Sequence, residues 1–241
     1  MKQLVLVTGG AASGKSVYAE QRIQEMFLAA KLPEKRLIYL ATMFNDGGPE
    51  AAARIRRHRA LRAEKGFETI EKPCGLEALL SDNRILENQE GAAGEYPAAP
   101  KGVVSAWQES FILLEDLGNL LANELYLPEG RLSGVYADPP VRVEESNLSA
   151  PGWNEERRHY PEDALLREYI LAPIRMLAEA ASALVIVSNE IFSDGETYPA
   201  ETMRYIRALG LLHRWIADEA DEVTEVVCGL PLMKKGRIGE G

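Results

Sequence analysis

The sequence contains little cysteine and no long apolar run, and both shortages exclude classes of protein. Its two cysteines, Cys74 and Cys228, form neither a CxxC pair nor a Cys/His zinc spacing. We interpret them as reduced thiols in or near the core. No run approaches the roughly 18 apolar residues of a membrane helix, and the first residues continue directly into a motif that must be retained, unlike a signal peptide. We therefore expect a cytoplasmic protein without a membrane span.

Basic residues are also in deficit. The chain carries 27 Lys and Arg against 37 Asp and Glu, for a formal net charge of −10. A generic binder of nucleic acid or of an anionic membrane needs a positive surface, so neither class is expected, although a local basic patch could still bind phosphate. The 241 residues, 46% hydrophobic and 27% charged, are typical of one large globular domain with room for an insertion.

Short apolar runs alternate with segments of helical periodicity, which predicts an α/β fold with a mostly parallel sheet. The strand candidates are rich in Val, Ile and Leu without alternation, as in strands that helices cover on both faces; they are residues 4–8, 37–41, 111–114, 184–188 and 223–227, with a weaker one at 68–71. Helices are expected at 14–30, 50–65, 76–86, 117–127, 161–181 and 199–217. Two Gly/Pro-rich stretches, 88–108 and 128–161, are interpreted as surface insertions in a single domain spanning 1–241.

The clearest motif follows the first apolar run. Residues 9–16 match G-x-x-x-x-G-K-[ST] in full, between a strand candidate and a helix candidate. Small residues in such a loop let successive backbone N–H groups surround a phosphate at the helix N-terminus. Lys15 is expected to reach the β- and γ-phosphates and Ser16 to hold Mg²⁺. The nucleotide-binding candidates here are Gly9, Gly10, Ala11, Ala12, Ser13, Gly14, Lys15 and Ser16. The alternative is a glycine-rich turn with an exposed lysine.

A P-loop also needs an acidic residue at the end of a neighbouring strand, to hold the Mg²⁺ shell. Glu115 and Asp116 directly follow the apolar run 111–114 and are the candidates. The alternative is that both carboxylates cap the helix that follows.

A histidine lies among arginines in the helix expected at 50–65. Glu50, Arg54, His58 and Arg62 are spaced by four and share one helix face. Arginines bind phosphate bidentately and disfavour a charged imidazole, so His58 could stay neutral and attack a nucleotide phosphorus. The alternative is a solvated basic face with an incidental histidine.

The other two histidines have simpler interpretations. His159 lies inside the second Pro-bounded stretch and is expected at the surface. His213 falls near the apolar stripe of the helix at 199–217, where a packed histidine is more common than a substrate ligand.

These motifs together resemble the bifunctional adenosylcobinamide kinase/adenosylcobinamide-phosphate guanylyltransferase family of cobalamin biosynthesis. The similar stretches run in family order: residues 7–16, Tyr39-Leu40-Ala41-Thr42, Arg54-Ile55, His58-Arg59 with Arg62, Thr69-x-Glu71, Leu113-Leu114-Glu115 with Asn123, Val187-Ser188-Asn189-Glu190, Ala220-Asp221-Glu222-Val223 and Gly229-Leu230-Pro231. The combination of Thr-Gly-Gly before the P-loop core and R-I-x-x-H-R downstream is one that generic P-loop kinases lack.

The resemblance implies a RecA-like P-loop fold and two reactions. A nucleoside triphosphate, ATP or GTP, phosphorylates the aminopropanol arm of adenosylcobinamide, and His58 then takes GMP from GTP and passes it to the substrate phosphate, giving adenosylcobinamide-GDP. By the same resemblance Lys15 and His58 are catalytic, Arg54, Arg62, Glu71 and Glu115 bind nucleotide, and Ser16 and Glu115 serve Mg²⁺. A homotrimer with a corrinoid substrate is also implied.

Several positions depart from the family pattern. Asp116-Leu117-Gly118 and His213-Arg214 replace the usual residues, Phe67 replaces a usual Trp, and residues 191–199 lack the usual Gly-rich turn. The nucleotide-handling half is thus expected intact and the corrinoid-facing parts divergent. Two alternatives stay open: a single-activity guanylyltransferase or small-molecule kinase, and a non-catalytic P-loop switch, which would have no need of a nucleophile at His58.

Overall fold

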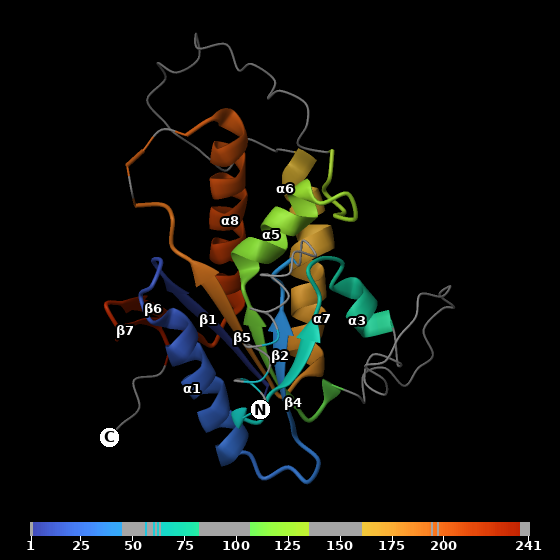
Figure 1. Cartoon of the computed structure of the whole chain (residues 1–241), viewed down its shortest axis with the longest axis vertical. Helices are drawn as coiled ribbons and strands as arrows, with labels where there is room; N and C mark the ends of the chain where they lie inside the picture. The colour runs from blue at the N-terminus through green and yellow to red at the C-terminus, as the bar shows by residue number, and fades with distance from the viewer. Residues whose placement is uncertain are drawn as a thin grey trace.

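A computed structural model describes residues 2–44, 56, 60, 62, 64–81, 107–134, 161–193, 195–196 and 198–236. Its elements follow the predicted alternation of strands and helices (Figure 1). In chain order they are β1 (Gln3–Gly9), α1 (Lys15–Ala29), β2 (Arg36–Ala41), β3 (Glu68–Glu71), α3 (Glu77–Ser81), β4 (Ser110–Glu115), α5 (Leu117–Tyr126), α6 (Pro161–Leu166), the π-helix η3 (Arg167–Leu171), α7 (Ala172–Ala180), β5 (Ala183–Asn189), α8 (Ala200–Glu219), β6 (Glu222–Val227) and β7 (Leu230–Lys235).

Within these residues the strands form one seven-stranded sheet in the order β3-β2-β4-β5-β1-β6-β7. Neighbours from β3 to β6 pair in parallel, and β7 pairs antiparallel with β6. The predicted α/β class with a mostly parallel sheet is confirmed. Because parallel strands end at one edge, the turns after β1, β2, β3, β4 and β5 share that edge of the sheet.

Both faces of the sheet are buried, since successive residues of each strand point to opposite faces. Leu4, Leu6 and their counterparts on the other central strands pack with α3, α5, α6, η3, α7 and α8. Val5 and Val7 pack on the other face with Ala19, Ile23 and Met26 of α1. This double burial explains why the strands read as unbroken apolar runs.

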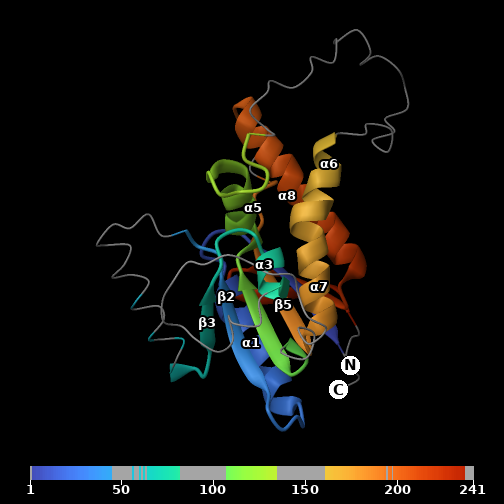
Figure 2. The same ribbon diagram turned by 90° about the vertical axis from the view of Figure 1, so that its right-hand side faces the viewer.

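The helix predicted at 161–181 contains a π turn. Figure 2 shows α6, η3 and α7 as one continuous run beside α8. Pro173 lies in the first turn of α7. It has no N–H to donate, and its ring crowds the preceding turn of a regular helix. The wider turn of η3, in which the Ala172 N–H donates to the Arg167 carbonyl, accommodates this.

The last strand, β7, was not expected. All six of its residues are exposed, and Pro231 together with Lys234 and Lys235 disguises it as a loop, although edge strands tolerate such residues. A two-residue turn closes the hairpin, with Cys228 at φ 51° and Gly229 at φ 81°, the geometry of a type I′ turn.

The other predicted elements fall within a few residues of their bounds. The helix expected at 50–65 lies largely outside the described residues, as does 82–86 of the helix expected at 76–86. The two expected insertions are also mostly outside them. Their described ends include the buried Trp107 and Leu132, which pack into the core. The single domain spanning 1–241 stays a prediction.

Candidate nucleotide-binding site

The phosphate-binding loop connects the end of β1 to the start of α1. Gly14 is the N-cap of α1 with φ 91°, a left-handed conformation that glycine adopts without strain, and it offers no side-chain cap. The first N–H groups of α1 are therefore available to an anion, which the positive end of the helix dipole also favours. The Ser13 N–H donates to the Gly10 carbonyl at 3.2 Å, and the buried Lys15 donates from Nζ to the same oxygen at 3.1 Å.

Close packing requires glycine at position 9. A Cβ on Gly9 would lie 2.5 Å from the Ser13 Oγ and 2.6 Å from the Val226 carbonyl oxygen. Nothing lies within 4 Å of a Cβ built on Gly10, and Ala11 and Ala12 are exposed. The two glycines of the motif start therefore have different roles: the first fits the loop against β6, while the second leaves the loop open to solvent.

The Ser13 hydroxyl is buried, and among the described residues Oγ has no hydrogen-bond partner. A buried hydroxyl without a hydrogen-bond partner costs free energy, which a bound ligand could recover.

Glu115 at the end of β4 faces the P-loop, although β5 lies between β4 and β1 in the sheet. The Ser16 hydroxyl donates to Oε1 of Glu115, and the Tyr39 hydroxyl donates to Oε2 at 2.7 Å. The expected acidic strand end is therefore present, one strand further from β1 than a direct neighbour.

Asp116 has the other role considered for this pair of acids. Its Oδ1 accepts the Asn119 N–H at 2.6 Å and so caps α5. Burial raises the pKa of Asp116, while the cap hydrogen bond opposes that shift. One acid thus faces the P-loop and the other caps the helix.

The turn after β2 is tied to these acids. Thr42 is fully buried; its N–H donates to the Glu115 carbonyl at 3.0 Å and its Oγ1 to the Asp116 carbonyl at 2.8 Å. The buried Asn123 of α5 donates from Nδ2 to the Thr42 carbonyl at 2.7 Å. These bonds give the end of β4 a fixed position relative to β2.

Arg62 is the one described member of the predicted arginine–histidine face. Its guanidinium carbon lies 3.6 Å from the centre of the Tyr39 ring, within the range of a cation–π contact. Arg54 and His58 lie outside the described residues, so their roles stay predictions. Glu71 is exposed at the end of β3, where it pairs in register with Ala41, and Ala41 in turn pairs with Glu115.

His213 is packed, as its place on the apolar stripe indicated. Its Nε2 lies 2.7 Å from Oγ of the fully buried Ser188, and its ring meets Phe192 edge-on with centroids 5.3 Å apart. Burial lowers the pKa of His213 to about 4, against a smaller opposing effect of Glu190. The imidazole is therefore neutral near pH 7. His159 lies outside the described residues.

The sequence motifs assigned no role at the nucleotide-binding edge of the sheet to Tyr39 or Gly229. Tyr39 appeared only as part of a strand and a family stretch, although a tyrosine in an otherwise aliphatic buried strand signals a hydroxyl that needs a partner. Gly229 donates its N–H to the Ser13 carbonyl at 2.8 Å and so supports the P-loop from the β6–β7 turn. That contact needed the unpredicted strand β7.

The oxygen donors at this edge fit Mg²⁺, a hard cation that prefers hydroxyl and carboxylate ligands together with phosphate and water. Ser16 and Glu115 would hold it, directly or through water. Among the described residues no group of three or more His, Cys, Asp or Glu side chains forms a metal cluster. A nucleotide site does not require one, since phosphates supply most of the ligands.

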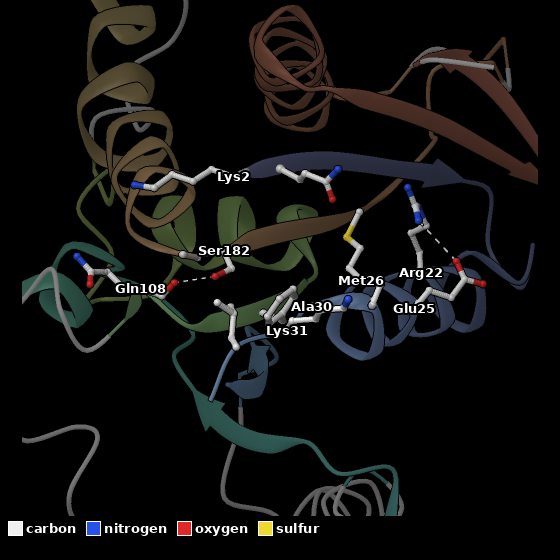
Figure 3. A pocket seen from close by; sticks show the side chains of 13 residues that line it. Lys2, Arg22, Glu25, Met26, Ala30, Lys31, Gln108 and Ser182 are labelled. Atoms are coloured by element: carbon white, nitrogen blue, oxygen red, sulfur yellow. Dashed lines mark hydrogen bonds and ion pairs between the residues drawn. The ribbon is translucent and has the colours of Figure 1, made fainter. Parts of the chain in front are cut away.

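A separate hollow of about 700 Å³ lies at the opposite edge of the sheet, where β1 and β4 begin (Figure 3). Arg22, Met26 and Lys31 line it from α1 and the residues after α1, and the Ser182 hydroxyl there donates to the Gln108 carbonyl at 2.6 Å. Arg22 is already paired with Glu222 at 2.7 Å. The hollow is thus remote from the P-loop, with its best anion ligand engaged elsewhere.

The parallel sheet, the loop at residues 9–16 and the acid at the end of β4 define a P-loop nucleotide-binding protein. The chain matches the cobinamide kinase / cobinamide phosphate guanyltransferase family over residues 5–90 and 94–234. It belongs to that family.

Two further similarities accompany this match. The chain is 29% identical over 231 residues to the bifunctional adenosylcobalamin biosynthesis protein CobP of Pseudomonas aeruginosa, covering 96% of each chain. Among solved structures, a KaiC-like protein from Pyrococcus horikoshii is similar with a TM-score of 0.42 at 12% identity, over 98% of this chain and 80% of that one. In the described residues no helix is long and apolar enough to cross a membrane.

Proposed function

We propose that this chain carries out both reactions of its family. The P-loop and the segment that contains His58 would supply the residues that bind and react with the nucleotide. In the first, the hydroxyl of the aminopropanol arm of adenosylcobinamide attacks the γ-phosphorus of a nucleoside triphosphate, releasing the diphosphate and a proton. In the second, an imidazole nitrogen of His58 attacks the α-phosphorus of GTP and releases pyrophosphate. A phosphate oxygen of the substrate then displaces the imidazole, giving adenosylcobinamide-GDP.

The residues of the P-loop supply binding and charge for phosphate. The Lys15 ammonium group lies 3.1 Å from the Gly10 carbonyl oxygen, within the P-loop motif. Ser16 and Glu115 would hold Mg²⁺, which offsets the negative charge that develops on the phosphoryl oxygens. Arg62, Arg54 and Glu71 are proposed to bind nucleotide beside this loop.

One observation carries the proposal: Ser16 of the P-loop motif donates to Glu115 at the end of β4, in a chain whose family match also spans position 58. A catalytic pair of reactions is favoured over a nucleotide switch because the arginine–histidine face would have no use in a switch. The phosphate donor of the first reaction stays open between ATP and GTP.

The test is to incubate the full chain with Mg²⁺ and GTP labelled at the α-phosphate, then quench and follow label on the protein. Wild type is compared with His58→Ala, with His159→Ala as the matched control. We expect an acid-labile, alkali-stable label in wild type and in His159→Ala, as a phosphoramidate would give, and none in His58→Ala. Phosphorylation of cobinamide should persist in His58→Ala.

Other outcomes point elsewhere. Label retained in His58→Ala would place the nucleophile on another residue. Binding of GTP without label, in a protein that still phosphorylates cobinamide, would indicate a kinase without transfer activity. Binding with neither reaction would favour a switch. A homotrimer is also proposed from the family resemblance alone, and the mass of the assembly in solution tests it. A cytoplasmic location stays the prediction made from the sequence.

A further inference from the structure

We propose that Tyr39 is a positioning residue with two contacts: its hydroxyl orients Glu115 beside the P-loop, and its ring orients the guanidinium of Arg62, which is proposed to bind nucleotide. This inference rests on the proposed function and names a residue that serves both of its reactions. Tyr39 lies within β2, where it pairs in register with Thr69 of β3 and Leu113 of β4. The two polar neighbours of its side chain, Glu115 and Arg62, come from different segments.

Among the described residues, the Tyr39 hydroxyl is one of two hydrogen-bond donors to the Glu115 carboxylate. Ser16 donates to Oε1 of Glu115 and Tyr39 to Oε2 at 2.7 Å. The tyrosine therefore keeps the carboxylate oriented when the Ser16 oxygen serves another ligand. A carboxylate held by a single rotatable contact would sample other rotamers, and a site loosened in that way binds and reacts less well.

The Tyr39 ring makes contacts with Arg62 and Phe67. The Arg62 guanidinium carbon lies 3.6 Å from the ring centre, and the Phe67 and Tyr39 rings meet edge-to-face with centroids 5.8 Å apart. The Tyr39 side chain is itself only 5% exposed. A buried ring clamped in this way offers Arg62 a rigid platform, so the guanidinium can face a phosphate with little loss of conformational freedom.

The two ends can be tested separately because the hydroxyl and the ring can be removed one at a time. Tyr39→Phe deletes the bond to Glu115 and keeps the platform for Arg62, whereas Arg62→Gln removes the guanidinium and keeps the bond to Glu115. Tyr18→Phe is the matched control, since it also removes a tyrosine hydroxyl that lies near a carboxylate, in this case Oε1 of Glu222 at 3.4 Å and not Glu115.

The first measurement is equilibrium binding of a non-hydrolysable GTP analogue in Mg²⁺ and in EDTA. The dissociation constant in EDTA divided by that in Mg²⁺ reports how well the site uses the cation. We expect Tyr39→Phe to lower this ratio about tenfold, the effect of losing one oriented charge-assisted bond, with binding in EDTA within about twofold of wild type. Arg62→Gln and Tyr18→Phe should leave the ratio unchanged.

The second measurement is the rate of labelling from α-labelled GTP. Arg62→Gln should slow it at least tenfold, and Tyr39→Leu, which lacks the ring and the hydroxyl, should show both defects. Thermal unfolding of each variant identifies any loss of folding, and Tyr39→Phe keeps the test valid if Tyr39→Leu does not fold.

An unchanged Mg²⁺ ratio in Tyr39→Phe, in a wild type that shows a clear Mg²⁺ advantage, would overturn the inference and leave the proposed function intact. A wild type with no Mg²⁺ advantage would overturn the metal role of Ser16 and Glu115, and this inference with it. Normal labelling in Arg62→Gln would overturn the ring half alone.

Discussion

The backbone N–H of Gly229 donates to the carbonyl oxygen of Ser13 at 2.8 Å, and this bond fastens the turn between β6 and β7 to the phosphate-binding loop. The two turns are closely packed as well as bonded, since a Cβ on Gly14 would lie 3.4 Å from the Gly229 Cα. The P-loop is therefore held by two contacts, one with the β6–β7 turn at Gly229 and one with β6 at Val226. Substitutions that add volume between these segments should disturb the loop before any nucleotide is present.

Gly9→Ala tests this packing. The added Cβ would lie 2.5 Å from Ser13 Oγ and 2.6 Å from the Val226 carbonyl, and overpacking of this kind costs about 1–3 kcal/mol of unfolding free energy. Urea unfolding of the nucleotide-free protein measures it. Gly10→Ala is the matched control, because nothing lies within 4 Å of its Cβ and the same measurement should move by less than about 1 kcal/mol. Equal losses in the two variants would contradict the packing argument.

Lys15→Ala should weaken both reactions. The ammonium group lies in the P-loop, and removing one preorganised charge at a reacting phosphate lowers the rate about 10²–10³-fold. Steady-state rates of cobinamide phosphorylation and of GMP transfer measure the effect, with Lys31→Ala at the opposite edge of the sheet as control. A variant that lost only one of the two rates would show that the P-loop serves a single reaction.

His213 gives a signed prediction for pH. Its pKa is about 4 in the folded chain because of burial, against about 6.5 when unfolded. The unfolded state therefore takes up the proton first, and this residue lowers the unfolding free energy as pH falls from about 6.5 to about 4, by up to about 3 kcal/mol. His213→Gln, which can keep a bond to Ser188, should remove that loss.

The measurement is the unfolding free energy at several pH values in both proteins. The difference between the two pH curves isolates the histidine, because Asp116 and Glu124 are present in both proteins. These two carboxyls act in the opposite direction to His213. Burial raises the pKa of both carboxyls, so they contribute a gain in stability as pH falls. Parallel curves for wild type and His213→Gln would show that His213 titrates normally.

Glu124 is a buried carboxylate with a structural task. It accepts the Gly75 N–H at 2.6 Å and the Arg131 N–H at 2.8 Å, and so joins two loops to α5. Glu124→Leu leaves both donors unpaired, which should cost about 2–5 kcal/mol of unfolding free energy. Urea unfolding checks this, with the exposed Glu129 changed to Leu as control. A loss below about 1 kcal/mol would mean that water replaces the carboxylate at both sites.

The sheet was predictable because its strands carry unmistakable apolar runs buried on both faces. The edge strand β7 was not, since Pro231 and its lysines are typical of loops, and only pairing with β6 turns that segment into a strand. The π turn at Arg167–Leu171 was also beyond sequence periodicity, which identifies a helix without resolving how it makes room for Pro173.

The candidate site also has parts that the sequence predicts and parts that only the fold reveals. Local pattern identified the P-loop and the acidic pair, because a phosphate cradle is built from consecutive residues. Which of the two acids faces the P-loop and which caps α5 depends on where β2 and α5 lie, so the sequence alone could not assign these roles to Glu115 and Asp116. The contact of Arg62 with Tyr39 joins segments that are distant in sequence, and no spacing rule indicates it. The roles of His58 and Arg54 stay predictions from sequence.

The strand order places a demand on a segment that contributes neither side chain of the Ser16–Glu115 pair. Val7 of β1 and Glu115 of β4 both pair with Val187, so β5 sets the level at which the loop and the acid face each other. A one-residue slip of β5 against either neighbour would shift their alignment by about 3.3 Å, more than a hydrogen bond tolerates. The geometry of the phosphate site thus depends on the register of an apolar strand, where a one-residue deletion should reduce activity at least as much as Lys15→Ala.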